Sequence, residues 1–199
     1  MTTKVSVVDD DPAVLDSIRL LLETHGLDVE CFSSPDQFLN AASETSCIVS
    51  DVRMPVMTGM ELLAELNARA DGRPVILLTG HGDIQMAVQA IRQGAYDFVE
   101  KPFEASRLVA SINEAIAKTQ KDQSERIAVK ELQERFASLS ERQKETMMLL
   151  VKGMANKEIA ARLGISPRTV EIHRTWVMNK MAAKTLAELV RIGIALKLT

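Results

Sequence analysis

A single carboxylate, Asp51, stands at the end of a short apolar run. The apolar residues 47–49 lead toward it, and Pro55 stops regular structure four residues later. Strands that are buried in a parallel sheet read as short apolar runs, and ligands bind at the carboxyl ends of such strands. The sequence therefore places Asp51 at the mouth of a sheet, where a small charged group can reach its side chain.

Further polar side chains follow other strand-like runs. Asp9 and Asp10 come directly after the first run, and Thr79 and Lys101 end later ones. Because parallel strands end at the same edge of a sheet, two carboxylates, a hydroxyl and an ammonium are expected to converge there on Asp51. That set is the one needed to transfer a phosphoryl group to a protein carboxylate.

The acidic cluster predicts a magnesium ion. Two carboxylates beside Asp51 repel one another by about 4 kcal/mol at a separation of about 4 Å and an effective dielectric constant of about 20. Such a cluster binds protons or a hard divalent cation, and oxygen ligands favour Mg²⁺. The cation clamps the transferring group, while Lys101 and Thr79 contact other phosphoryl oxygens. The alternative is that residues 9–11 only cap the following helix, and the other polar residues favour the site.

Four segments resemble the receiver domain of two-component response regulators. They are VVDDD at 7–11, SDVRMP at 50–55, LTGHGD at 78–83 and FVEKPF at 98–103, and the resemblance covers roughly residues 3–118. The implied roles are phosphoacceptor for Asp51, Mg²⁺ ligands for Asp9, Asp10, Asp51 and the backbone carbonyl of Arg53, phosphoryl contacts for Thr79 and Lys101, and switch residues for Thr79 and Phe98. The family often has tyrosine at the position of Phe98, so a step that depends on that hydroxyl is absent here.

Two loop residues add to the resemblance. His81 is either a general base or a loop histidine, and the loop assignment is favoured. Lys101 precedes Pro102, and receivers usually hold this peptide bond cis, which aims the ammonium into the pocket.

Length, composition and cysteine usage indicate a bacterial cytoplasmic protein with no membrane partner. A chain of 199 residues fits two small domains, and its hydrophobic content of 46% supports real cores. No apolar run reaches 18 residues, and the start of the chain leaves no room for a signal peptide. Cys31 and Cys47 lack CxxC spacing and are expected to be buried thiols in a reducing cytosol.

Charge divides the chain into two halves. Residues 1–120 hold 9 basic and 18 acidic side chains, whereas residues 121–199 hold 15 basic and 9 acidic ones. We expect a receiver domain over 1–118, a helical linker over 119–137 and a helix-turn-helix domain over 138–199. The linker lacks Gly and Pro and extends the last receiver helix. A short coiled coil between subunits is the alternative, although the apolar periodicity is poor.

The first domain alternates strand and helix patterns, as a wound α/β fold requires. Strands are expected at about 4–8, 28–32, 47–51, 75–78 and 97–99, with helices after Pro12, from Pro35, from Gly59, at about 83–93 and from Glu104. Five parallel strands and five helices form the flavodoxin-like fold that the resemblance implies.

The second domain reads as four helices. Their expected first or capping residues are Ser140, Asn156, Ser166 and Thr185, and Gly164 separates the second helix from the third. A helix, a short turn and a capped helix predict a helix-turn-helix motif, and a small bundle without DNA affinity is the alternative.

The third helix has a face that suits base edges. Val170, Val177 and Met181 form its apolar side, and the opposite side mixes hydroxyl, carboxylate, aliphatic and guanidinium groups. Residues 156–160 and 166–174 strongly resemble the LuxR/NarL output domain, and the combination with this receiver is most similar to the FixJ subgroup. The expected DNA contacts are Lys157, Ser166, Arg168, Thr169, Glu171, Ile172, His173, Arg174, Thr175 and Lys180. Trp176 lies at the edge of this face with no assigned role.

The sequence thus predicts a phosphorylation-activated transcription regulator rather than an enzyme. Its chemistry is limited to Mg²⁺-dependent uptake of a phosphoryl group from a histidine kinase and slow autodephosphorylation. Activation is expected to form a homodimer through helix four (Ile84, Met86, Val88, Ile91) and strand five. This dimer is expected to bind a two-fold promoter site and to engage RNA polymerase. The acidic receiver could also cover the basic domain at rest. One alternative is an aspartate-nucleophile phosphatase that acts on small substrates. That class needs D-x-D after the first strand and a substrate cap, and no cap is inserted in this sequence. The other alternative is a phosphate-independent regulator driven by partner binding, which the intact acceptor set disfavours.

Overall fold

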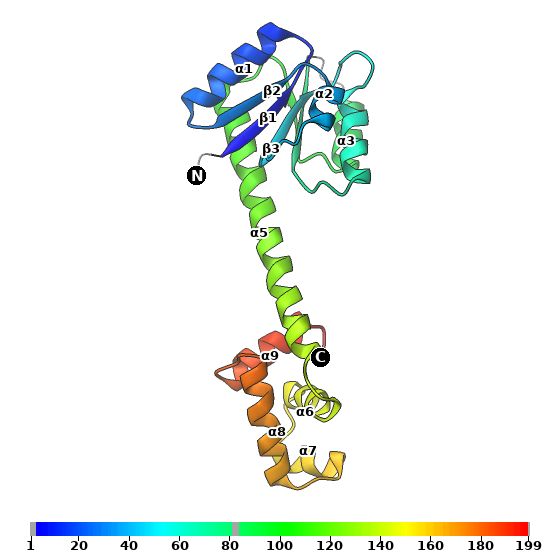
Figure 1. Ribbon diagram of the computed structural model, residues 1–199, viewed down its shortest axis with the longest axis vertical. Coiled ribbons are helices and arrows are strands. Elements are labelled where there is room, and N and C mark those ends of the chain that lie inside the picture. Colours follow the sequence, from blue (N-terminus) through cyan, green and yellow to red (C-terminus); the bar gives the residue numbers. More distant parts are fainter. Residues whose placement is uncertain (1–2, 81–83, 199) are drawn as a thin grey trace. The chain divides into compact units, whose positions relative to one another are not determined.

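The computed structural model describes residues 3–80 and 84–198, and the chain divides into two compact units, residues 1–121 and 122–199. In the described part of the first unit, five strands form one parallel sheet in the order β2-β1-β3-β4-β5 (Figure 1). The strands are β1 (Lys4–Val8), β2 (Asp28–Phe32), β3 (Cys47–Asp51), β4 (Val75–Thr79) and β5 (Asp97–Glu100). This is the flavodoxin-like order, so the expected fold is confirmed.

Helices cover both faces of the sheet (Figure 1). They are α1 (Pro12–Thr24), α2 (Pro35–Asn40), α3 (Gly59–Ala68), α4 (Ile84–Arg92) and α5 (Ala105–Ala137). Buried residues of α1 and α5 share one hydrophobic cluster, and those of α2, α3 and α4 share the cluster on the opposite face. The central strands β3 and β4 are buried along their whole length, which explains their uninterrupted apolar sequences.

The cysteines differ in burial because their strands differ in position. Cys47 lies in central strand β3 and is fully buried, and burial raises the pKa of its thiol to about 12. Cys31 lies in β2, at the edge of the sheet, and is only partly buried, so the expectation that both thiols are buried is wrong for Cys31. The Nε atom of Arg19 donates to its sulfur at 3.4 Å.

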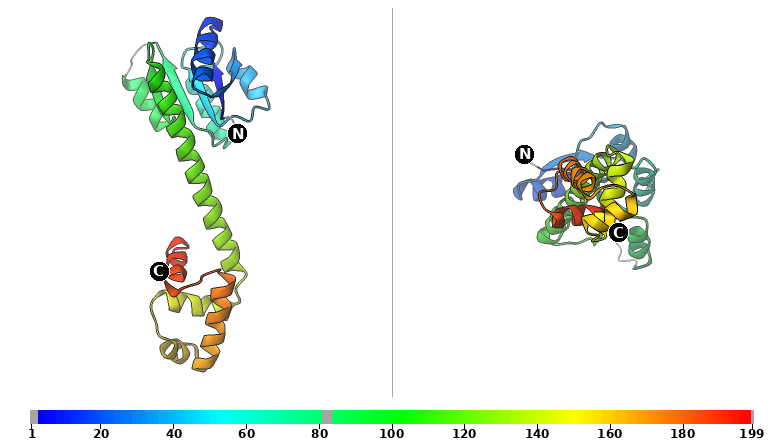
Figure 2. Two further views of the ribbon diagram at one scale, coloured as in Figure 1. Left: turned by 90° about the vertical axis from the view of Figure 1, so that its left-hand side faces the viewer. Right: turned by 90° about the horizontal axis from the view of Figure 1, so that it is seen from below.

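The second unit is a helical bundle. It contains α6 (Glu141–Val151), α7 (Asn156–Leu163), α8 (Pro167–Lys180) and α9 (Leu186–Ala195), seen together in Figure 2. Its core includes Met147, Ile159 and Val170. Leu132 and Phe136, near the C-terminal end of α5, pack against the same core. The helix that the sequence predicts as a linker therefore contributes side chains to this unit.

The start of α7 corrects one sequence prediction. Asn156 is not the N-cap of α7; Ala155 is, and Asn156 is the first helical residue. The Glu158 carboxylate accepts a hydrogen bond of 2.7 Å from the Ala155 backbone N–H, which fixes the boundary one residue earlier. An N-cap at Asn156 would place Ile159 at that third position, where a buried aliphatic side chain can bond nothing. The caps at Ser140, Ser166 and Thr185 are confirmed.

A glycine sets the approach of α9 to α6. A Cβ atom added at Gly193 would lie 2.6 and 2.7 Å from the two methyl groups of Val151, which is itself buried. We expect Gly193→Ala to destabilise the second unit by about 1–3 kcal/mol, because a stiff β-branched side chain cannot move aside. Urea unfolding followed by Trp176 fluorescence measures this, since Trp176 is the single tryptophan.

The matched background is Val151→Ala, which empties the space that the new methyl group needs. In that background we expect Gly193→Ala to stabilise the unit by about 1 kcal/mol, the helix propensity difference between alanine and glycine. A loss of equal size in both backgrounds would contradict a direct clash between the two positions.

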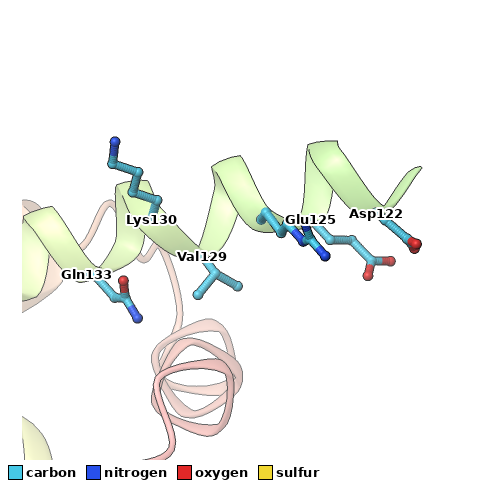
Figure 3. A pocket seen from close by; sticks show the side chains of 6 residues that line it. Asp122, Glu125, Val129, Lys130 and Gln133 are labelled. Carbon is cyan, nitrogen blue, oxygen red and sulfur yellow. The ribbon is translucent and has the colours of Figure 1, made fainter. Parts of the chain in front are cut away.

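A shallow hollow of about 410 Å³ lies along the C-terminal part of α5 and is lined by Asp122, Glu125, Arg126, Val129, Lys130 and Gln133 (Figure 3). In this view Val129 and Lys130 point to opposite sides of the helix. The lining is almost entirely charged or polar and comes from one helix.

No helix in the described part of the chain combines the length and apolarity needed to cross a bilayer.

Candidate functional site

Strand register brings the predicted acidic residues together. Val8 of β1 lies opposite Ser50 of β3, so the residues that follow them, Asp9 and Asp51, are neighbours at the carboxyl edge of the sheet. The Lys101 ammonium donates to Asp51 Oδ1 at 2.6 Å and to Asp9 Oδ2 at 2.9 Å. Three side chains from widely separated parts of the sequence thus meet in one charged cluster.

Backbone amides fix both carboxylates. The N–H of Arg53 donates to Asp51 Oδ2 at 2.6 Å, and the N–H of Asp11 donates to Asp9 Oδ1 at 3.0 Å. Asp11 itself caps α1 by accepting from the N–H of Ala13. The capping role that the sequence offered for the acidic run therefore applies to Asp11, whereas Asp9 faces Lys101. Each carboxylate keeps one oxygen on an amide and the other on the ammonium.

The environment keeps Lys101 protonated. Burial opposes the charge on this ammonium, but hydrogen bonds and charge attraction from Asp51 and Asp9 outweigh burial and raise its pKa. The side chain is about one quarter exposed, whereas Asp9 and Asp51 are 2% and 9% exposed as residues. The cluster therefore presents a permanent positive charge next to two buried carboxylates.

The other site residues predicted for the receiver differ in how deeply they are buried. Thr79 is buried at the end of β4, and its carbonyl oxygen accepts a hydrogen bond of 2.6 Å from the Lys101 N–H. Phe98 is half-buried and packs against the cluster formed by α2, α3 and α4. Asp10 and Arg53 are exposed. The Lys101–Pro102 peptide bond is cis, and His81, like the expected helix start at residue 83, lies outside the described residues.

The donor set fits a magnesium ion. Across residues 3–80 and 84–198, no three acidic, histidine or cysteine side chains gather closely enough to hold a metal by themselves. Magnesium in phosphoryl-transfer sites needs only one or two carboxylates, because waters and substrate oxygens supply its other ligands. Asp9 and Asp51, which share one ammonium, provide that pair of carboxylates.

Gly59 is a site residue that the sequence reading used only as a helix start. It opens α3, and a Cβ atom at this position would fall on the carbonyl oxygen of Asp51, with the Leu77 side chain at 3.2 Å. The Gly59 N–H donates to the carbonyl of Val52 at 3.0 Å. The first turn of α3 therefore rests directly on the backbone of the predicted acceptor. A small residue eight positions after Asp51 is the only sequence signal for this contact.

The predicted recognition helix α8 has the expected two sides. Val170, Val177 and Met181 are buried in the core of the second unit. The exposed residues on the other side are Arg168, Glu171, Ile172, Thr175, Trp176 and Asn179. Ile172 and Trp176 are 52% and 54% exposed, so two large apolar side chains stand among polar ones.

Several predicted DNA contacts are engaged within the unit. The Ser166 hydroxyl oxygen accepts from the Thr169 N–H at 3.1 Å and caps α8. The Lys180 ammonium donates to the carbonyl of Ser138 at 2.7 Å, and the residue is exposed. The buried Nδ1 atom of His173 has no hydrogen-bond partner in the described part of the chain. Lys157 is exposed on α7, and Arg174 is half-buried.

Comparison with known families decides the identity of the chain. The response regulator receiver domain family matches residues 5–113, and the luxR family of bacterial regulatory proteins matches residues 137–192. The chain is a response regulator. Its receiver and LuxR-type domains make it a phosphorylation-activated DNA-binding transcription regulator, not a classical enzyme.

The regulator resembles two bacterial regulatory proteins along almost its whole length. It is 46% identical over 192 residues to the transcriptional regulatory protein FixJ of Azorhizobium caulinodans, a match that covers 96% of the regulator and 91% of the relative. It is 40% identical over 195 residues to the response regulator TodT of Pseudomonas putida, covering 97% and 86%.

Two solved structures resemble the regulator along almost its whole length. The response regulator StyR matches with a TM-score of 0.82 and 38% identity over 96% of the regulator and 98% of StyR. Full-length FixJ from B. japonicum matches with a TM-score of 0.64 and 41% identity over 100% of both chains.

Proposed function

We propose that the regulator accepts its phosphoryl group on Asp51 from the phosphohistidine of a sensor histidine kinase. The observation that carries this proposal is the Lys101 ammonium, which lies 2.6 Å from Asp51 Oδ1 and 2.9 Å from Asp9 Oδ2. In the transfer, an Asp51 carboxylate oxygen forms a bond to phosphorus, and the bond from phosphorus to the kinase histidine nitrogen breaks with its electron pair leaving on nitrogen.

Each residue around Asp51 has a defined task. Lys101 neutralises charge on the transferring phosphoryl oxygens, and its raised pKa keeps it protonated while it does so. The Arg53 N–H orients the carboxylate through Oδ2 and leaves Oδ1 to the ammonium. Asp9, Asp10, Asp51 and the carbonyl of Arg53 would hold Mg²⁺, which supplies a second positive charge for the phosphoryl oxygens.

Activation is proposed to run from Thr79 to the surface of α4 and β5. The phosphoryl group adds about two negative charges, and the Thr79 hydroxyl turns toward them to donate a hydrogen bond. Phe98 is half-buried on β5, opposite Leu77 of β4 and so two residues along from Thr79, and it rotates inward, which reshapes the neighbouring surface. Ile84, Val88 and Ile91 are 80%, 46% and 50% exposed there, an apolar set suited to a second copy of the receiver.

We expect phosphorylation with acetyl phosphate and Mg²⁺ to shift the protein from monomer to dimer by 1–3 kcal/mol, about 5- to 150-fold in the association constant. Sedimentation velocity of the full chain before and after labelling measures the shift. Ile84→Asp should block dimer formation without changing uptake, because a carboxylate opposite its own copy is unfavourable. If DNA binding strengthens while the protein stays monomeric, release of a resting cover over the output domain carries the activation instead.

The second unit is proposed to read a two-fold promoter site through α8. A dimer joins two weak half-site contacts, which raises affinity without any new contact on either half. Glu171, Ile172 and Thr175 are exposed on α8 and supply groups that fit base edges. Promoter-bound regulator then engages RNA polymerase.

We expect two classes of output-domain variant. Thr175→Ala or Glu171→Ala should cost about 1–3 kcal/mol on the selected site and alter base preference, whereas Lys157→Ala should weaken every sequence alike and lower the salt slope by about 1. Fluorescence anisotropy on the selected site and on a random duplex, over a series of salt concentrations, separates the classes. Equal losses on both duplexes for all three variants would refute the assignment of this face.

A further inference from the structure

Ile172 and Trp176 form an apolar pair on the exposed side of α8. The two residues are 52% and 54% exposed, and neither belongs to the hydrophobic core of the second unit. They are four residues apart on one helix, so their side chains are neighbours along the same side. The Trp176 indole is the larger of the two side chains and offers the most apolar area to a ligand.

Polar side chains surround this pair. Arg168, Glu171, Thr175 and Asn179 are exposed on the same side of α8. The Thr175 hydroxyl donates to the Glu171 carbonyl at 3.0 Å, which leaves Thr175 as an acceptor only. A surface that docks another protein is usually a contiguous apolar patch. Apolar groups that stand singly among hydrogen-bonding groups match the major groove instead, where thymine presents a methyl group beside its O4 acceptor.

The position of Trp176 along α8 determines which base pair it can reach. A helix with its side chains is about 10–12 Å wide and fits a major groove of about 12 Å. In a helix-turn-helix motif the N-terminal part of the second helix contacts base edges, and Ile172 lies in that part of α8 (Pro167–Lys180). Four residues advance the helix by about 6 Å, close to the roughly 7 Å that two base-pair steps span. Trp176 therefore reaches bases about two steps beyond those of Ile172.

We propose that Trp176 is a specificity-determining residue whose indole ring packs against the 5-methyl group of a thymine in each half-site. The preferred ligand is then double-stranded DNA that carries thymine about two base pairs from the base contacted by Ile172. This inference rests on the proposed reading of a two-fold promoter site by α8, and it adds a base that none of the proposed contacts reads.

Replacement of thymine by uracil tests the contact, because uracil lacks only the methyl group. The full-length regulator, phosphorylated with acetyl phosphate and Mg²⁺, first selects duplexes from a random pool. Each thymine of the selected duplex is then replaced by uracil in both half-sites, one position at a time. At one position we expect the affinity of the wild type to fall about 16-fold, about fourfold for each methyl group lost. Trp176→Ala should show no loss at that position in fluorescence anisotropy.

Three variants serve as controls. Trp176→Phe keeps an aromatic ring and should keep the sensitivity to uracil. Ile172→Ala should lose its sensitivity at a different position. Ile127→Ala removes an exposed apolar side chain on α5, outside α8, and should leave the whole uracil pattern unchanged. The melting temperature of Trp176→Ala should match that of wild type, because the side chain is outside the core.

The fluorescence of the wild type gives a second measurement. Trp176 is the single tryptophan, so quenching by acrylamide reports the exposure of this side chain alone. We expect the selected duplex to protect it from acrylamide, since the indole enters the groove.

A selected duplex without a thymine in each half-site would overturn the inference. So would a Trp176→Ala variant that keeps the wild-type penalty at every uracil position, because any affinity it loses would then come from the DNA backbone or a second subunit. Acrylamide quenching that does not change on binding of the selected duplex would also overturn it. A phosphorylated regulator that selects no duplex would instead overturn the proposed function.

Discussion

Asp51→Asn should reduce phosphoryl uptake from acetyl phosphate by at least about 100-fold, to background. The amide oxygen is a poor nucleophile, and the substitution changes neither the size of the side chain nor its place at the end of β3. The fold should persist, because Lys101 keeps Asp9 as a partner at 2.9 Å. Intact-protein mass spectrometry measures uptake as the gain of one phosphoryl group, and circular dichroism checks the fold.

Removal of Mg²⁺ by chelation is the matched test on the wild-type protein and should give the same loss of labelling. Residual labelling that maps to a different residue in Asp51→Asn would remove Asp51 from its proposed role. Labelling of the wild type that survives chelation would contradict the magnesium proposal while leaving Asp51 as the acceptor.

Gly59→Ala should lower the stability of the receiver unit by about 3 kcal/mol or more, which corresponds to a fall of roughly 10 °C in its melting temperature. The new Cβ atom would overlap the carbonyl oxygen of Asp51, and backbone in a fully buried central strand cannot shift cheaply. Uptake at Asp51 should fall as well, since relief of the overlap displaces the acceptor.

Gly80→Ala is the control for the stability effect. It changes the same residue type near the same site, but no described atom lies within 4 Å of its added Cβ, and its φ is not in the left-handed region. Its melting temperature should match that of wild type. Equal melting temperatures for the Gly59 and Gly80 variants would contradict a close approach of α3 to the acceptor strand.

The sheet and the acceptor cluster could be predicted because they depend on local patterns. A buried parallel strand needs an apolar run, and the residue that ends the run must lie at the shared edge of the sheet. The positions of the strand ends in the sequence therefore predict that Asp9, Asp51 and Lys101 lie close together. Helix caps such as Ser166 are equally local, since a serine followed by proline restricts the backbone at a helix start.

Other features depend on contacts that no local pattern reveals. The boundary at Ala155 is set by Glu158 reaching back, which overrides the usual preference for asparagine as a cap. The Lys180 ammonium bonds to a carbonyl 42 residues away in sequence, so its charge alone did not indicate where it points. The left-handed backbone of Val56 contradicts residue preference outright. The packing of Leu132 and Phe136 against the core of the second unit could not be predicted, because two apolar residues in a charged segment give too weak a helical periodicity.

The division of α5 between two cores has a consequence for how such regulators recombine. Ile116 is buried in the receiver and Leu132 packs against the output core, whereas residues 121–128 are exposed. A gene fusion with its crossover inside 121–128 joins a foreign receiver to this output domain without removing a side chain from either core. A crossover after residue 137 would strip Leu132 and Phe136 from the output domain. Residues 121–128 are therefore a stretch of helix within which one receiver domain can replace another without repacking of either core.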